Sequence, residues 1–134
     1  MKVSDATLRD TAHMAGVHFD EDDARVLAGL LCEVGVDIVE AGIVSNADRS
    51  EVPLVQAVVE VAGRERTKTV ILARSRKQVE EDLDAALETG AGNVMLSIPT
   101  SPTHAMLKLQ TDSERRIMTL AARTIELAKS AGLS

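Results

Sequence analysis

Short apolar runs alternate with helical patterns four times along this chain, and this alternation limits the possible folds more than any other feature. The apolar runs, which have the length of buried strands, cover residues 3–8, 36–43, 69–73 and 93–98. A helical pattern follows each run, so that each strand–helix unit takes about 25 to 35 residues. Such regular alternation is typical of a parallel sheet with right-handed crossovers and two covered faces. We therefore expect a single α/β domain built from four consecutive βα units.

Start and stop signals of the helices support the same division. The four helices are expected to begin near Asp20, Ser50, Ser75 and Thr111. Thr111 and Glu114 have the spacing of a capping box, and an acidic run or a serine occupies the other starts. Glycines end three of the helices, at Gly35, Gly90 and Gly132. The stretch between the fourth strand and Thr111 is expected to be a polar loop.

The composition excludes several classes of partner. Phe19 is the only aromatic residue, and the formal net charge is −6 with a pI near 5.0. Nucleic-acid binding by base stacking or phosphate contacts is therefore not expected. No stretch reaches the roughly 18 apolar residues of a membrane span, and the N-terminus has no apolar signal core. The single cysteine, Cys32, lies in an apolar run and is expected to be a buried small residue, which fits a reducing cytoplasmic setting.

Polar and charged residues follow each of the four expected strands. They are, in chain order, Arg9, Asp10 and His13; Glu40, Ser45 and Asn46; Arg74; and Thr100, Ser101 and His104. Ligands of parallel α/β folds gather where the strands deliver their carboxyl ends, so all four groups are expected on one rim. Guanidinium groups suit oxyanions, and carboxylates suit divalent metals. The set fits a metal-assisted reaction on an anionic carbonyl compound.

Each candidate also has a purely structural interpretation. Arg9 and Asp10 could form a solvated ion pair of little energetic value, and His13 could satisfy a loop backbone. Ser101 and His104 stand in a proline-marked loop, where a turn role explains them equally well. Glu40 is the hardest to dismiss, because a carboxylate inside an apolar strand needs a partner or a purpose.

Four motifs in consistent order resemble the metal-dependent barrel enzymes that include 2-isopropylmalate synthase and homocitrate synthase. Residues 5–10, which read DATLRD, are similar to the signature of that family. Residues 35–42 resemble its second strand, residues 72–75 its third βα unit, and residues 97–104 its fourth-strand loop. The resemblance covers essentially all 134 residues.

The resemblance implies a TIM (β/α)₈ barrel as the fold. As the function it implies an acyltransferase of amino-acid biosynthesis, which condenses acetyl-CoA with a 2-oxo acid. It also implies a divalent metal, Mg²⁺, Mn²⁺ or Zn²⁺. Carried over by position, Asp10 would be a metal ligand, and Arg9 would be catalytic by stabilising the oxygen that becomes negative. The 2-oxo acid pocket would be lined or bordered by Glu40, Arg74, Thr100, Ser101 and His104.

One departure from the family lies in residues 9–13, which read RDTAH where the synthases typically read RDGEQ. Loss of the glycine removes easy access to positive φ. His13 replaces a glutamine that helps to hold the substrate, and it resembles the acid–base histidine of the 4-hydroxy-2-oxo acid aldolases. An aldolase, or a carbon–carbon lyase similar to HMG-CoA lyase, is therefore the alternative function, with His13 catalytic.

The second departure is length. A TIM barrel needs about 250 residues, and this chain has 134. The family's paired metal histidines form a His-x-His element, which is absent from a sequence whose histidines are His13, His18 and His104. We therefore interpret residues 1–134 as a partial catalytic domain, the N-terminal half of a barrel with little activity alone. It would pair with the missing half or form a homo-oligomer. A non-catalytic half-barrel that serves assembly is a third interpretation.

Overall fold

Four parallel strands form one sheet in the computed structural model, which describes residues 1–72 and 75–134, with residues 76 and 77 by backbone alone. The strands, which lie side by side in chain order, are β1 (Ser4–Asp5), β2 (Ile38–Ile43), β3 (Thr67–Leu72) and β4 (Asn93–Ser97). Consecutive parallel neighbours are the arrangement found in a TIM barrel. The predicted α/β fold of four βα units is confirmed, and the open sheet has the topology of the N-terminal half of such a barrel.

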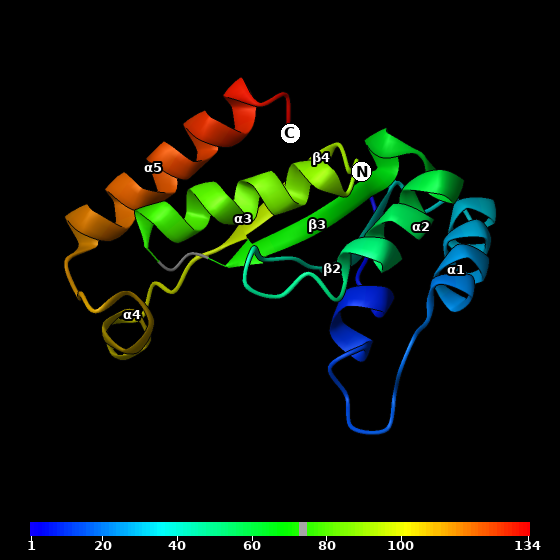
Figure 1. Cartoon of the computed structure of the whole chain (residues 1–134), viewed down its shortest axis with the longest axis horizontal. Helices are drawn as coiled ribbons and strands as arrows, with labels where there is room; N and C mark the ends of the chain where they lie inside the picture. The colour runs from blue at the N-terminus through cyan, green and yellow to red at the C-terminus, as the bar shows by residue number, and fades with distance from the viewer. Residues whose placement is uncertain (73–74) are drawn as a thin grey trace.

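Helices cover one side of this sheet. They are α1 (Glu21–Glu33), α2 (Val52–Ala62), α3 (Arg76–Glu88), α4 (Pro102–Leu109) and α5 (Glu114–Ser130), with a short 3₁₀ turn, η2 (Arg64–Arg66), before β3. Figure 1 shows α2 and α3 in front of the sheet, with α1 beside α2 and α5 beside α3. Val39 and Ile71 of the strands pack there against Val55, Val58 and Val79 of the helices. Among the described residues, no helix is long and apolar enough to cross a bilayer.

A bulge in β2 sets which residues of β2 and β3 face the same way. Glu40 pairs with Lys68 of β3, and the register then shifts so that Gly42 pairs with Thr69. The Thr69 hydroxyl donates to the Gly42 carbonyl at 3.1 Å, which holds the strands together beyond the bulge. Directly paired residues share a face of the sheet, so Glu40 and Lys68 are neighbours there.

The first strand is shorter than predicted. β1 ends at Asp5, and the chain continues as η1 (Thr7–Thr11), a π-helical turn. The Asp5 carboxylate accepts the backbone N–H of Thr7 at 2.9 Å and the hydroxyl of the same residue at 3.2 Å. This local hydrogen bonding competes with strand pairing and turns the chain out of the sheet. Arg9 and Asp10 therefore stand on a helical turn rather than at a strand end.

A helix replaces the polar loop predicted after β4. Ser101 caps α4 by accepting the backbone N–H of His104 at 3.3 Å, and Pro102 occupies the first turn. The capping box predicted at Thr111 is also wrong. The N-cap of α5 is Ser113, and Thr111 Oγ1 instead accepts the backbone N–H of that residue.

Candidate functional site

A guanidinium and a carboxylate meet where η1 lies against β2. The Nη2 and Nε atoms of Arg9 donate to the same oxygen of Glu40, Oε2, at 2.8 and 3.1 Å. Glu40 belongs to β2 and is only 7% exposed. A hydrogen-bonded ion pair with so little exposure holds both side chains in one orientation. The structure thus brings together two of the residues that the sequence placed at one rim.

The second Glu40 oxygen is held by groups from the two neighbouring strands. Ser4 Oγ of β1 donates to Oε1 at 3.1 Å, and Lys68 Nζ of β3 lies 3.3 Å from the same atom. Sequence reasoning missed both partners. Lys68 stands directly before the apolar run 69–73, and a lysine so close to a buried strand was a signal for an anionic partner.

The environment of Glu40 keeps it charged. Burial raises the pKa of this carboxyl, but hydrogen bonds from Arg9 and Lys68, the Lys68 charge and the Ser4 hydroxyl outweigh burial, so the pKa lies below its ordinary value of 4.5. At neutral pH the Glu40 carboxylate of β2 is therefore ionised and lies between two cations, Arg9 of η1 and Lys68 of β3. Arg9 is oriented by an ionised partner that is itself fixed.

Asp10 lies on the exposed side of Arg9. Its carboxylate forms an ion pair with Arg9 Nη1, and 65% of its side chain is exposed. Within residues 1–72 and 75–134, no group of three His, Cys, Asp or Glu side chains is arranged to hold a metal ion. A tightly held catalytic metal needs more protein ligands than one exposed carboxylate. The described residues therefore do not form a metal centre by themselves. Asp10 is the one ligand that they could contribute to such a centre.

His13 lies beside a carboxylate that the sequence analysis did not single out. Its Nε2 atom is 3.9 Å from Oε1 of Glu51, the N-cap residue of α2. The other Glu51 oxygen accepts the backbone N–H of Ile43 at 2.7 Å. Gly42 makes this possible, because a Cβ at that position would lie 2.6 Å from the same oxygen. A glycine and a glutamate nine residues apart give no recognisable sequence signal.

The residues that follow β4 surround a cavity of about 360 Å³. Its lining includes Thr100, Ser101 and His104, which the sequence analysis named, and also Lys108 of α4. The Ser101 hydroxyl is engaged in capping α4. Lys108, in the last turn of α4, joins this lining. Arg74, the remaining predicted pocket residue, lies outside the described residues.

Ser45 and Asn46 have structural partners. The Ser45 hydroxyl accepts the backbone N–H of Asp48 at 3.0 Å, which closes a turn after β2. The backbone N–H of Asn46 donates to Asp82 of α3 at 2.8 Å, and the Asn46 side chain accepts from Arg49 at 2.9 Å. These contacts fasten the loop after β2 to α3.

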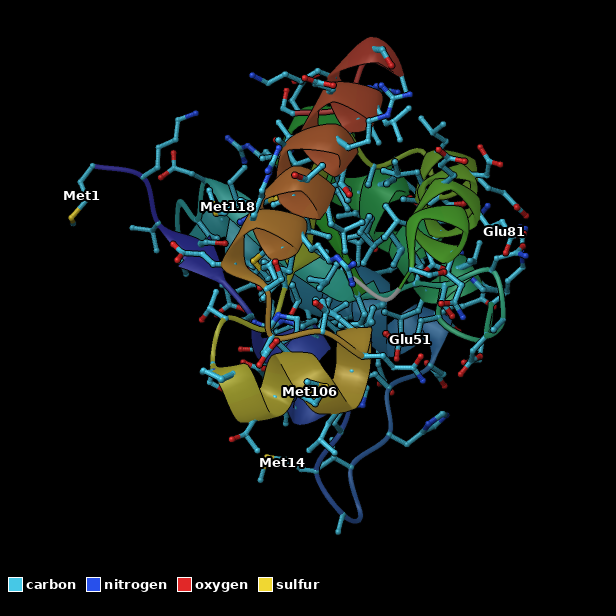
Figure 2. The ribbon with its side chains drawn as sticks, turned by 90° about the vertical axis from the view of Figure 1, so that its left-hand side faces the viewer. Met1, Met14, Glu51, Glu81, Met106 and Met118 are labelled. Atoms are coloured by element: carbon cyan, nitrogen blue, oxygen red, sulfur yellow. The ribbon has the colours of Figure 1, made fainter. Side chains whose placement is uncertain are left out.

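The predicted shared rim is visible in the arrangement of the elements. In Figure 1, η1, the loop after β2 and α4 all lie at the edge toward which β3 and β4 run. Figure 2 shows Met14, which follows η1, and Met106 of α4 toward the same lower side. Arg9 and Glu40 touch, His13 and Glu51 approach each other, and the residues after β4 form a separate cavity.

Comparison with known proteins identifies the family. The profile of the HMGL-like family matches residues 1–134. The (R)-citramalate synthase of Methanocaldococcus jannaschii is 34% identical over 99% of this chain and 26% of that protein. The 2-isopropylmalate synthase of a Geobacillus species is 34% identical over 96% of the chain and 24% of that protein. That of Sulfolobus acidocaldarius is 29% identical over 99% of the chain and 33% of the protein.

The chain thus spans between 24% and 33% of the length of these three relatives. The family profile nevertheless covers every residue of the chain, and the fold agrees with it. The resemblance to 2-isopropylmalate synthases is confirmed, and the chain belongs to the HMGL-like family.

Proposed function

We propose that residues 1–134 are the N-terminal half of a catalytic TIM-barrel domain that condenses acetyl-CoA with a 2-oxo acid. The observation that carries this proposal is the fixed guanidinium of Arg9, which η1 presents and Glu40 of β2 holds. The names of the relatives, citramalate synthase and 2-isopropylmalate synthase, support an acyltransferase of this superfamily.

The geometry of Arg9 suits stabilisation of a developing oxyanion. A guanidinium has five N–H donors, and Arg9 directs three of them at Glu40 and Asp10. The remaining two are available for the oxygen of a 2-oxo acid that gains negative charge as the new carbon–carbon bond forms. Because Glu40 holds the guanidinium before substrate arrives, little reorganisation is needed in the transition state.

The other candidate residues have roles in the same proposal. Asp10 supplies one ligand of a divalent metal, whose other ligands come from outside the described residues, and we assign no step to that metal. We assign binding of the 2-oxo acid to Glu40, Arg74, Thr100, Ser101 and His104, of which the last three line a cavity separate from Glu40 in this structure. The cavity of about 360 Å³ beside the last three residues supports this assignment, since it offers His104 and Lys108 to an anionic group.

A graft tests the proposed function. In the graft, this chain replaces the matched N-terminal segment of the Methanocaldococcus citramalate synthase. We expect release of free CoA thiol from acetyl-CoA with at least one member of a panel of 2-oxo acids. The remainder of the relative without the graft is the control and should release none. A folded graft that releases no thiol with any 2-oxo acid would contradict an acyltransferase function.

An aldolase or lyase of the same superfamily is the second candidate, and the approach of His13 to Glu51 favours it. A histidine beside an oriented carboxylate is a suitable acid–base pair. His13→Gln in the graft separates the two functions. In a synthase the change should be mild, because glutamine is the usual residue of the family there. In an aldolase it should abolish cleavage of 4-hydroxy-2-oxo acids.

A further inference from the structure

Lys68 is a charged residue of an inner strand. It is the second residue of β3 and pairs directly with Glu40 of β2 across the sheet. Paired residues share a face, so the lysine and the carboxylate stand side by side. Both β2 and β3 have a neighbouring strand on each side, so this pairing does not involve an edge of the sheet. With 22% of its side chain exposed, Lys68 lies largely inside the molecule.

The two oxygens of Glu40 have different partners. Lys68 Nζ lies 3.3 Å from Oε1 and 3.4 Å from Ser4 Oγ, which itself donates to Oε1 at 3.1 Å. Oε2 accepts from Nε and Nη2 of Arg9. The carboxylate therefore cannot turn away from Arg9 without losing the contacts of Oε1. Lys68 is thus one of the groups that fix the oxygen to which Arg9 is bound.

Lys68 also changes the balance of charge around Arg9. A guanidinium whose charge is compensated by a carboxylate attracts a further anion weakly. Glu40, 7% exposed, is the closely held partner of Arg9, whereas the Asp10 side chain is 65% exposed and is screened by water. Lys68 places a second cation on the other oxygen of Glu40. Arg9, Glu40 and Lys68 together then carry one net positive charge, since two cations face one anion.

We propose that Lys68 is a positioning residue for the condensation, which holds Glu40 so that Arg9 keeps its orientation and an uncompensated charge for the developing oxyanion. This inference rests on the proposed function, because it concerns the same oxyanion. Lys68 acts through Glu40 and is assigned no contact with the substrate. The competing explanation is that Lys68 only stabilises the fold by pairing with a buried carboxylate. The two explanations differ in which property of the enzyme responds when Lys68 is changed.

Kinetics of the graft separate these explanations. Lys68→Met keeps an unbranched side chain and removes the charge. We expect kcat to fall about tenfold while KM for the 2-oxo acid changes by less than about twofold, because the oxyanion exists only in the transition state. Lys68→Arg restores a cation and should return kcat to within about threefold of the unchanged graft. Lys2→Met is the matched control, because Lys2 is exposed and lies outside the site, and it should leave kcat unaltered.

A double-mutant cycle tests whether Lys68 acts through Glu40. Lys68→Met combined with Glu40→Gln should have the kcat of Glu40→Gln alone, because Lys68 then has no carboxylate to hold. The double variant removes both charges, so it avoids the cost of a buried charge without its partner. Circular dichroism checks that each variant is folded. Losses in kcat that multiply in the double variant would contradict an action through Glu40.

Chemical modification gives a readout that needs no turnover. Phenylglyoxal reacts with accessible guanidinium groups, and peptide mass spectrometry follows each arginine of the graft separately. Arg9 should be modified about fivefold faster in Lys68→Met, because Glu40 no longer holds it in one orientation. Arg25 of α1 is the internal reference, since its partner is Glu60, and its rate should be equal in both proteins.

The outcomes distinguish this inference from the proposed function. An unchanged graft that releases no thiol with any 2-oxo acid contradicts the proposed function, and the role of Lys68 in the condensation falls with it. In a graft that turns over, a kcat for Lys68→Met equal to that for Lys2→Met overturns the role of Lys68 alone. An equal rate of Arg9 modification in folded Lys68→Met and in the unchanged graft overturns it as well.

Discussion

At the scale of single residues, Glu40 organises the candidate site, because it joins Arg9 of η1, Ser4 of β1 and Lys68 of β3. Glu40→Gln preserves the shape and removes the charge, which leaves two cations facing each other. We expect the free energy of unfolding to fall by about 2 kcal/mol. Urea denaturation measures this, and Glu65→Gln at an exposed position is the control. Equal unfolding midpoints for the two variants would contradict the role given to Glu40.

The lowered pKa of Glu40 also predicts a pH dependence. A carboxyl whose pKa is lower in the folded state adds stability above its unfolded value, here 4.5, and loses it as pH falls through the folded value. The difference in unfolding free energy between the unchanged chain and Glu40→Gln should therefore shrink as the pH falls below 4.5. A difference that stays constant over that range would show that Glu40 is not ionised in a pair.

Gly42 is expected to be intolerant of a side chain. A Cβ there would lie 2.6 Å from the Glu51 oxygen that binds Ile43 and 3.2 Å from Val55. Gly42→Ala should cost about 1–2 kcal/mol of unfolding free energy. Gly29→Ala, inside α1, is the control. Its Cβ would lie 3.8 Å from Val61 of α2, so the unfolding free energy should rise by about 0.5–1 kcal/mol. Thermal unfolding of both variants measures these differences. If Gly42→Ala is at least as stable as the unchanged chain, Glu51 does not depend on the missing side chain at Gly42.

Some of these residue contacts could be predicted and others could not. The meeting of Arg9 with Glu40 agrees with the expectation that they lie together, although Arg9 stands on the turn η1 and Glu40 within β2. Lys68 and Glu51 were missed because their partners depend on strand register and on a β2 bulge. Register is set by packing across the whole sheet and is not written in the local pattern.

At the scale of elements, capping decides where the helices begin. Asp20 Oδ1 accepts the backbone N–H of Asp23 at 2.8 Å, and the Asp23 carboxylate accepts the backbone N–H of Asp20 at 3.2 Å. Asp20→Ala should cost about 1 kcal/mol of unfolding free energy. Ser113→Ala, at an N-cap without a side-chain bond, should cost less than about 0.5 kcal/mol. Similar losses in urea denaturation for both variants would contradict this assignment.

The same physical reasons explain which elements were predicted. The strands over β2, β3 and β4 and the helices α1, α2, α3 and α5 were anticipated from long apolar patterns and strong caps. The prediction failed where short polar side chains act on the backbone. Asp5 ends β1 early, and Ser101 starts α4 within a segment expected to be a loop. Such hydrogen bonds are local, but whether one of them closes a turn or caps a helix depends on the surrounding fold.

At the scale of the whole molecule, the sheet has the topology of half a barrel, and the proposed function makes the site described here one part of an active site. We therefore expect the 134-residue chain alone to release no thiol from acetyl-CoA above background with any 2-oxo acid. A thiol-release assay on the isolated chain tests this, and turnover at an ordinary enzyme rate would contradict it.

The most direct test of the account is the effect of Arg9→Lys on kcat/KM in the grafted enzyme. Lysine keeps the charge but loses the planar fork that Glu40 orients, so we predict a fall of about 100-fold. Arg25→Lys changes the same residue type in a surface ion-pair cluster of α1 and should have no more than about a twofold effect. If Arg9→Lys retains kcat/KM as fully as Arg25→Lys does, the guanidinium at the rim does not carry the chemistry.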